Sequence, residues 1–235
     1  MSFFSRKSPQ KKNDEDRVQI IEDLQDALKT SHITRIYNDV HSLTYERHLA
    51  NSEVPFVING AIESVAQKDI DQGIRLALYT ISNIGERRSG EAFDLLADKA
   101  FSLMKRADKT NMKQVAGVAM LAHVLSDAYT HDTANATRAR QEWLSAFDTL
   151  AADKKEGIQY AFAAASNVAI AKSWKNPLRQ KAIEAWEKAV TGLAHTDKQA
   201  ALKEAARVAG GYDSFGDDAA PFRSIAQGAL QKLSR

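Results

Sequence analysis

Apolar positions recur every three or four residues along most of this chain, which predicts a succession of amphipathic helices. The first apolar stripe begins near Arg17 and ends at Thr30-Ser31, a second starts at Ile33, and a third follows Pro55. No stretch of useful length alternates with period two, so we expect no sheet. Only 4 prolines and 11 glycines punctuate the 235 residues, which leaves room for long helices.

Four later stretches of the chain align on one another. Each opens at an aspartate that is followed eight residues later by an alanine; the four openings are Asp69, Asp108, Asp153 and Asp197. By subtraction they are 39, 45 and 44 residues apart. A period near 40 residues with two helices per unit is typical of stacked helical hairpins. In the third copy, Asp153 and Glu156 have the spacing of a capping box at a helix start.

The pattern predicts an all-α fold, a right-handed α-solenoid of stacked helical hairpins with an atypical N-terminal capping unit. Residues 1–16 are expected to form a flexible tail, because they contain almost no apolar side chain after Phe4. Residues 17–68 form the helical cap, and the four hairpins occupy 69–107, 108–152, 153–196 and 197–235, in one continuous domain with the cap. Residues 69–235 resemble the HEAT and armadillo family of helical repeats in their period and pattern. That resemblance implies an interaction scaffold.

Two tryptophans, Trp143 and Trp186, lie on the apolar stripes of the second helices of two hairpins. The first helices of the hairpins are rich in alanine, for example at residues 161–165. A large side chain facing small ones allows close packing between neighbouring helices, so both tryptophans are expected in the core.

Composition narrows the range of functions. The chain has no cysteine, which excludes disulfides, thiolate nucleophiles and thiolate metal sites. The 32 basic and 30 acidic residues leave a net charge of +2, which gives no reason to expect a nucleic acid partner. No window approaches the length of apolar sequence needed to span a membrane, and the N-terminus lacks the apolar region of a secretory signal, so we expect a cytoplasmic protein.

The candidate polar constellations favour structural roles. His41, Tyr45 and His48 share one helix face, but no third metal ligand accompanies the histidines, and we expect them to be solvent-facing or half-buried. His123 and Asp127 are one turn apart and can form a local hydrogen bond. The segment 210–218 is rich in glycine and aspartate but fits neither a calcium loop nor a phosphate loop. We therefore expect no catalytic residue, no metal and no cofactor.

The expected function is a non-enzymatic adaptor or scaffold that binds another protein, as a subunit or accessory factor of a larger assembly. The turns that join the two helices of each hairpin lie along one edge of a stack, and here they carry aromatic and basic side chains suited to binding. These predicted partner-binding residues are Arg87, Arg88, Tyr129, His131, Lys172, Trp174, Lys175, Tyr212 and Phe215. The alternative is a HEAT-like DNA-binding protein of the alkylation-repair glycosylase type, which the chain resembles in length and helical repetition.

Overall fold

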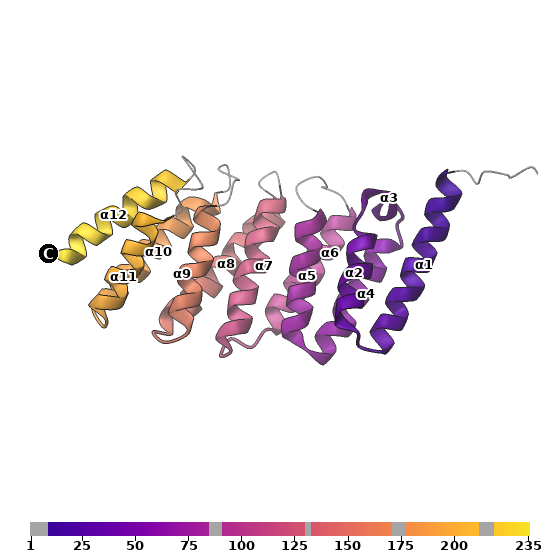
Figure 1. The fold of residues 1–235 in the computed structure, drawn as a ribbon, viewed down its shortest axis with the longest axis horizontal. Coiled ribbons are helices and arrows are strands. Elements are labelled where there is room, and N and C mark those ends of the chain that lie inside the picture. The colour runs from indigo at the N-terminus through magenta and orange to yellow at the C-terminus, as the bar shows by residue number, and fades with distance from the viewer. Residues whose placement is uncertain (1–8, 85–90, 130–132, 171–176, 212–218) are drawn as a thin grey trace, which may run out of the picture. The chain divides into compact units, whose positions relative to one another are not determined.

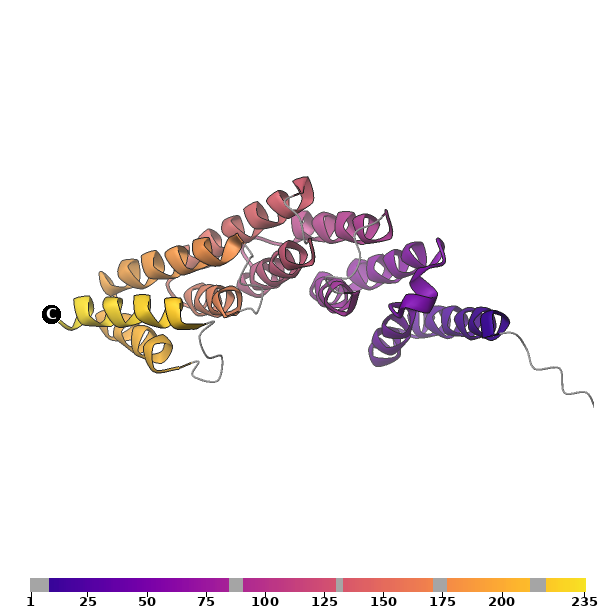
Figure 2. The same ribbon diagram turned by 90° about the horizontal axis from the view of Figure 1, so that it is seen from above.

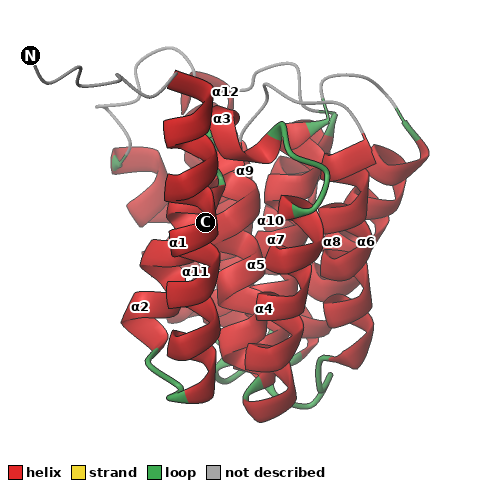
Figure 3. Cartoon of the chain, turned by 90° about the vertical axis from the view of Figure 1, so that its right-hand side faces the viewer, coloured by secondary structure: helices red, strands yellow, loops and turns green. Residues whose placement is uncertain are grey.

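A computed structural model of the chain describes residues 9–84, 91–129, 133–170, 177–211 and 219–235. Over these ranges the fold is entirely helical and contains no strand (Figures 1 and 3). The all-α prediction is therefore confirmed. The chain divides into two compact units, residues 1–106 and residues 107–235.

Unit 1 contains six of the described helices. They are α1 (Pro9–Lys29), α2 (Ile33–Leu43), α3 (Glu46–Leu49), α4 (Val54–Lys68), α5 (Ile70–Ile84) and α6 (Glu91–Arg106). Apart from α2 and α3, consecutive helices pack against each other, and α4 also contacts α1, α2 and α6. The core between them is closed by fully buried side chains, including Leu24, Val40, Ile58, Ile62, Ile74, Ile81 and Phe101.

Helix α1 begins earlier than the apolar pattern predicted. The pattern placed the start of this helix near Arg17, directly after the expected flexible tail at residues 1–16, whereas the helix starts at Pro9. Proline is well suited to a first helical position because its φ angle is already helical and the missing amide has no partner there. An ion pair of 2.9 Å between Asp14 and Arg17, one turn apart, supports the added turns.

Helices α4 and α5 approach each other very closely. A β-carbon placed on Gly73 of α5 would collide with Ala66 of α4, so only glycine fits at this contact. The close approach fixes the first turn of α5 beside the last turn of α4, which is where the site described below lies.

Unit 2 contains α7 (Met112–Ala128), α8 (Ala134–Ala152), α9 (Gly157–Ala169), α10 (Leu178–Ala194), α11 (Lys198–Gly210) and α12 (Ala220–Ser234). Each helix packs on the next, and α7 also contacts α9 while α8 contacts α10. Figure 2 shows α7 and α9 in one layer of this unit and α8 and α10 in a second layer. Trp143 and Trp186 are 0% exposed, so the prediction that both are core residues is confirmed.

Two of the four aspartates that open the repeats, Asp69 and Asp197, cap the helix that follows, whereas Asp153 bonds to amides of the turn before α9 and of its first residue. The Asp69, Asp153 and Asp197 carboxylates each accept a hydrogen bond from one or two backbone amides two to four residues later, at 2.8–3.3 Å. The bonds of Asp69 and Asp197 satisfy amides that have no partner inside the first helical turn. Asp108 differs, because α7 is capped instead by Asn111, whose side chain accepts two amides at 3.1 and 3.3 Å.

The capping box predicted in the third repeat is wrong, because the residue at the N-cap of α9 is Glu156 rather than Asp153, and Glu156 makes no side-chain capping bond. Glu156 is the residue immediately before α9, so its side chain cannot reach back to the cap amide as a residue inside the first turn could. Its carboxylate accepts a hydrogen bond from the Tyr160 hydroxyl at 2.9 Å instead.

Candidate functional site

Two helices of unit 1 carry matching stripes of side chains along the line where they meet. On α2, Ile33, Tyr37 and His41 follow one another at intervals of four residues and share a face. On α5 the corresponding stripe consists of Gln72, Arg75 and Tyr79. We call these two stripes the α2–α5 seam.

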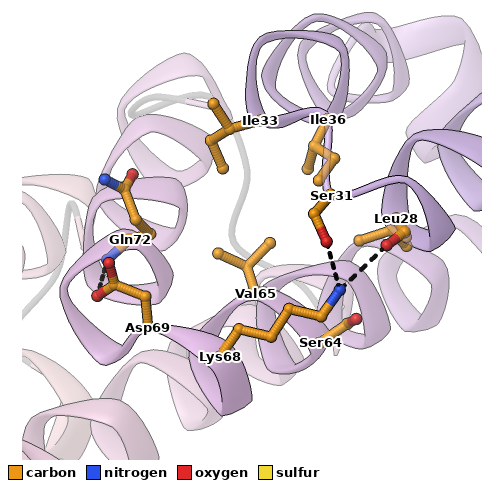
Figure 4. A pocket seen from close by; sticks show the side chains of 9 residues that line it. All are labelled: Leu28, Ser31, Ile33, Ile36, Ser64, Val65, Lys68, Asp69 and Gln72. Atoms are coloured by element: carbon orange, nitrogen blue, oxygen red, sulfur yellow. Dashed lines mark hydrogen bonds between the residues drawn. The ribbon is translucent and has the colours of Figure 1, made fainter.

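A small pocket opens at the end of the seam where both helices begin. It has a volume of about 260 Å³, and its lining comes from the ends of α1 and α4 and the starts of α2 and α5: Leu28, Ser31, Ile33, Ile36, Ser64, Val65, Lys68, Asp69 and Gln72. Figure 4 shows Ile33 and Ile36 pointing toward Val65, with polar groups at the two ends of the pocket. Ile33 is 39% exposed, which makes it one of the few large apolar side chains that face solvent.

The end of the pocket near α1 is built by a helix terminus and a lysine. Ser31 has the left-handed φ of 55°, and the amide of His32 donates to the carbonyl of Ala27 at 2.9 Å, which closes α1 as a left-handed C-cap. The Lys68 ammonium donates to the Leu28 carbonyl at 3.2 Å and to the Ser31 hydroxyl at 2.8 Å (Figure 4). A cation at a helix C-terminus is electrostatically favourable, so Lys68 has a structural role in holding this wall.

Aromatic rings continue the seam beyond the pocket. The Tyr79 ring lies 5.3 Å from the Tyr37 ring and 5.7 Å from the His41 ring, measured between centroids. The His41 ring is also 5.3 Å from Tyr45, whose hydroxyl lies 3.3 Å from His41 Nε2. Tyr45 is 52% exposed, so the ring cluster reaches the surface. Tyr37, His41 and Tyr79 are half-buried, so the cluster presents a rigid, largely apolar surface with one exposed ring at its edge.

Arg75 lies between the pocket and the ring cluster. Its side chain is exposed, and among the described residues no carboxylate lies within ion-pair distance of it. Burial raises the pKa of Tyr37, against an opposing effect of the nearby Arg75 charge. The Tyr37 hydroxyl therefore remains protonated at neutral pH and can donate a hydrogen bond.

Of the predicted partner-binding residues, the structure places only Tyr129. It follows the last residue of α7, and its hydroxyl accepts a hydrogen bond from the Asn135 amide at 3.0 Å. The other residues predicted along this edge lie outside the described ranges: Arg87, Arg88, His131, Lys172, Trp174, Lys175, Tyr212 and Phe215.

The histidine constellations have different environments. His123 Nε2 lies 3.0 Å from the Asp127 carboxylate, so the two side chains come together as predicted, but over the described ranges His123 Nε2 does not make the predicted hydrogen bond. The prediction that His48 is solvent-facing or half-buried is wrong, because His48 is 0% exposed. It lies on the short helix α3, which packs on α1 and α4. Over the described ranges, no group of three histidine or carboxylate side chains is arranged to hold a metal ion.

Comparisons of the chain with known protein families, with curated proteins and with solved structures find no match. No helix in the part of the chain that the structure describes is long and apolar enough to cross a membrane.

The seam was not anticipated from the sequence, although its residues are visible there. The spacing of Ile33, Tyr37 and His41 marks a helix face, and so does the spacing of Gln72, Arg75 and Tyr79. Periodicity reveals such a face but not which other helix lies against it.

Proposed function

We propose that this protein is a non-enzymatic adaptor that binds another protein through the α2–α5 seam. In this proposal the helical pairs form a HEAT-like, right-handed α-solenoid, and the protein acts in the cytoplasm as a subunit or accessory factor of a larger assembly. The observation that carries the proposal is the seam itself, in which an apolar pocket, an exposed arginine and a cluster of four rings lie in one line.

The composition of the seam is typical of protein interfaces. Tyrosine and arginine are enriched among the residues that dominate binding energy, because they offer large contact areas together with hydrogen-bond donors. The pocket volume of about 260 Å³ is below the range of roughly 300–1,000 Å³ of most small-molecule sites. It suits a single apolar side chain better than a whole metabolite.

The test is recovery of a partner from native cells by tagged wild-type protein and by two seam variants, Tyr79→Ala and Ile33→Asp. Phe56→Ser is the matched control, since Phe56 is 65% exposed and has no ring contact with the cluster. We expect one protein to be recovered in stoichiometric amount by the wild type and by Phe56→Ser, and lost with both seam variants. Nuclease treatment and a salt series accompany each recovery. A partner retained by both seam variants places binding elsewhere, and recovery of nucleic acid alone, lost with rising salt, favours the DNA-binding alternative.

A further inference from the structure

We propose that the α2–α5 seam recognises an acidic segment of its partner, with one apolar side chain in the pocket and a carboxylate on Arg75. This inference rests on the proposed function and specifies the chemistry of the partner. It is carried by the order of the groups along the seam and by the charge of Arg75.

The charges along the seam favour an anion. Arg75 is the one fixed charge of the two stripes, whose other members are isoleucine, glutamine, histidine and tyrosine. A guanidinium group offers paired donors that match the two oxygens of a carboxylate. Tyr37 lies near enough to feel the Arg75 charge, and its hydroxyl can donate to the same acceptor.

The other charged groups at this end of the seam are already engaged or differently placed. Lys68 is held by two neutral acceptors of α1, and Asp69 accepts two backbone amides of α5. Asp71 lies one turn before Arg75 but is not paired with it, and its Oδ1 is buried without a hydrogen-bond partner over the described ranges. Among the described residues of the two stripes, Arg75 is thus a cation that no carboxylate holds and that an incoming group can reach.

The spacing along α5 sets the spacing in the partner. Gln72 lines the pocket, and Arg75 follows it by about 4.5 Å along the helix axis at roughly 1.5 Å per residue. An extended chain advances about 3.3 Å per residue, and the arginine side chain adds reach of its own. We therefore expect the acidic residue one to three positions from the apolar anchor.

The experiment is selection from a random library of 12-residue peptides displayed on phage, carried out with the full chain. Wild type, Arg75→Glu and the control Arg35→Ala are compared. Arg35 lies on α2, one of the two helices of the seam, but its exposed side chain contacts Asp23 at 3.6 Å rather than a residue of the seam. Thermal unfolding followed by circular dichroism confirms that each variant is folded before selection.

We expect the wild type and Arg35→Ala to select peptides with an apolar residue one to three positions from Asp or Glu. Arg75→Glu should select lysine or arginine at that position. A synthetic peptide from the wild-type selection should bind Arg75→Ala at least about tenfold more weakly, as expected for loss of a hydrogen bond to a charged group. Fluorescence anisotropy measures this change.

Two results overturn the inference: selections without enrichment of acidic residues, or the same selected sequences for wild type and Arg75→Glu. A cellular partner that depends on Tyr79 and Ile33 but is indifferent to Arg75→Glu also overturns it, and leaves the proposed function standing. A partner indifferent to all three substitutions overturns the proposed function itself.

Discussion

Arg75 in unit 1 and Arg207 in unit 2 lie in comparable places, each on a helix that starts a hairpin, yet their surroundings differ. Arg207 of α11 donates two hydrogen bonds of 2.7 Å to the Glu204 carboxylate and one of 3.1 Å to the Ser166 hydroxyl of α9. Arg75 has no carboxylate partner among the described residues. One arginine is part of a completed network, and the other is open to solvent.

The network around Arg207 extends into the core of unit 2. Glu204 is only 8% exposed, and it also accepts a hydrogen bond of 2.9 Å from Nε1 of the fully buried Trp186. A buried carboxylate needs such partners, because its loss of water would otherwise be very unfavourable. The comparison indicates that Arg207, which links α11 to α9, stabilises the fold, and that Arg75 of α5 is available for binding.

The largest expected effect is on Arg207. Arg207→Ala leaves the buried Glu204 carboxylate without its cation, and we expect a loss of about 2 kcal/mol in the unfolding free energy of unit 2. This is below the usual cost of breaking a buried pair because Arg207 is itself half exposed. Urea unfolding can be followed by tryptophan fluorescence, since all 3 tryptophans of the chain lie in residues 107–235. A loss under about 0.5 kcal/mol, the range of ordinary surface substitutions, would contradict the structural role.

The two buried tryptophans of unit 2 also differ in whether the indole N–H has a hydrogen-bond partner. Trp143 Nε1 has no hydrogen-bond partner over the described ranges, whereas Trp186 Nε1 donates to Glu204. Trp186→Phe should therefore cost about 1.5 kcal/mol more than Trp143→Phe, the contribution of a hydrogen bond to a charged group. Urea unfolding followed by the remaining tryptophans measures both, and equal losses would show that Glu204 adds nothing to the burial of Trp186.

A smaller effect is expected at the pocket wall of unit 1. Ser31→Ala leaves the strained left-handed backbone as it is and removes the acceptor of Lys68, so we expect a loss of about 1 kcal/mol. Ser31→Gly removes the same acceptor but relieves the backbone, so its net change should be close to zero. Hydrogen exchange of the α1 amides measures the change in stability for both variants. If glycine is as harmful as alanine, the backbone conformation is not the deciding factor.

The smallest expected change in stability is at Arg75. Arg75→Ala should alter the unfolding free energy of unit 1 by less than about 0.5 kcal/mol, because the side chain is exposed and pairs with no carboxylate among the described residues. Thermal unfolding followed by circular dichroism measures this. Arg207→Ala is the converse control, since it should lower stability without changing peptide binding at the seam. A large loss of stability in Arg75→Ala would assign this arginine a structural role and remove the contrast.

The helical architecture could be predicted from the amino-acid sequence, because the information that specifies helices is local. The period of about 40 residues set out the helical pairs, and the apolar stripes placed Trp143 and Trp186 in the core. Capping side chains act within a few residues of themselves, so Asp69 and Asp197 could be recognised in advance. Asp108 could not, because a second capping residue, Asn111, stands closer to the helix start.

Which helix faces remain exposed could not be predicted from the sequence, because it depends on how helices far apart in the chain pack. Tyr37 and Tyr79 are separated by 42 residues, by subtraction, and their ring contact follows from the way that α2 and α5 pack. The same holds for the two arginines, which are equivalent as residue types but differ in whether a carboxylate lies within reach after folding. Contacts between distant parts of the chain determine burial and charge pairing, and these properties distinguish a binding surface from a core.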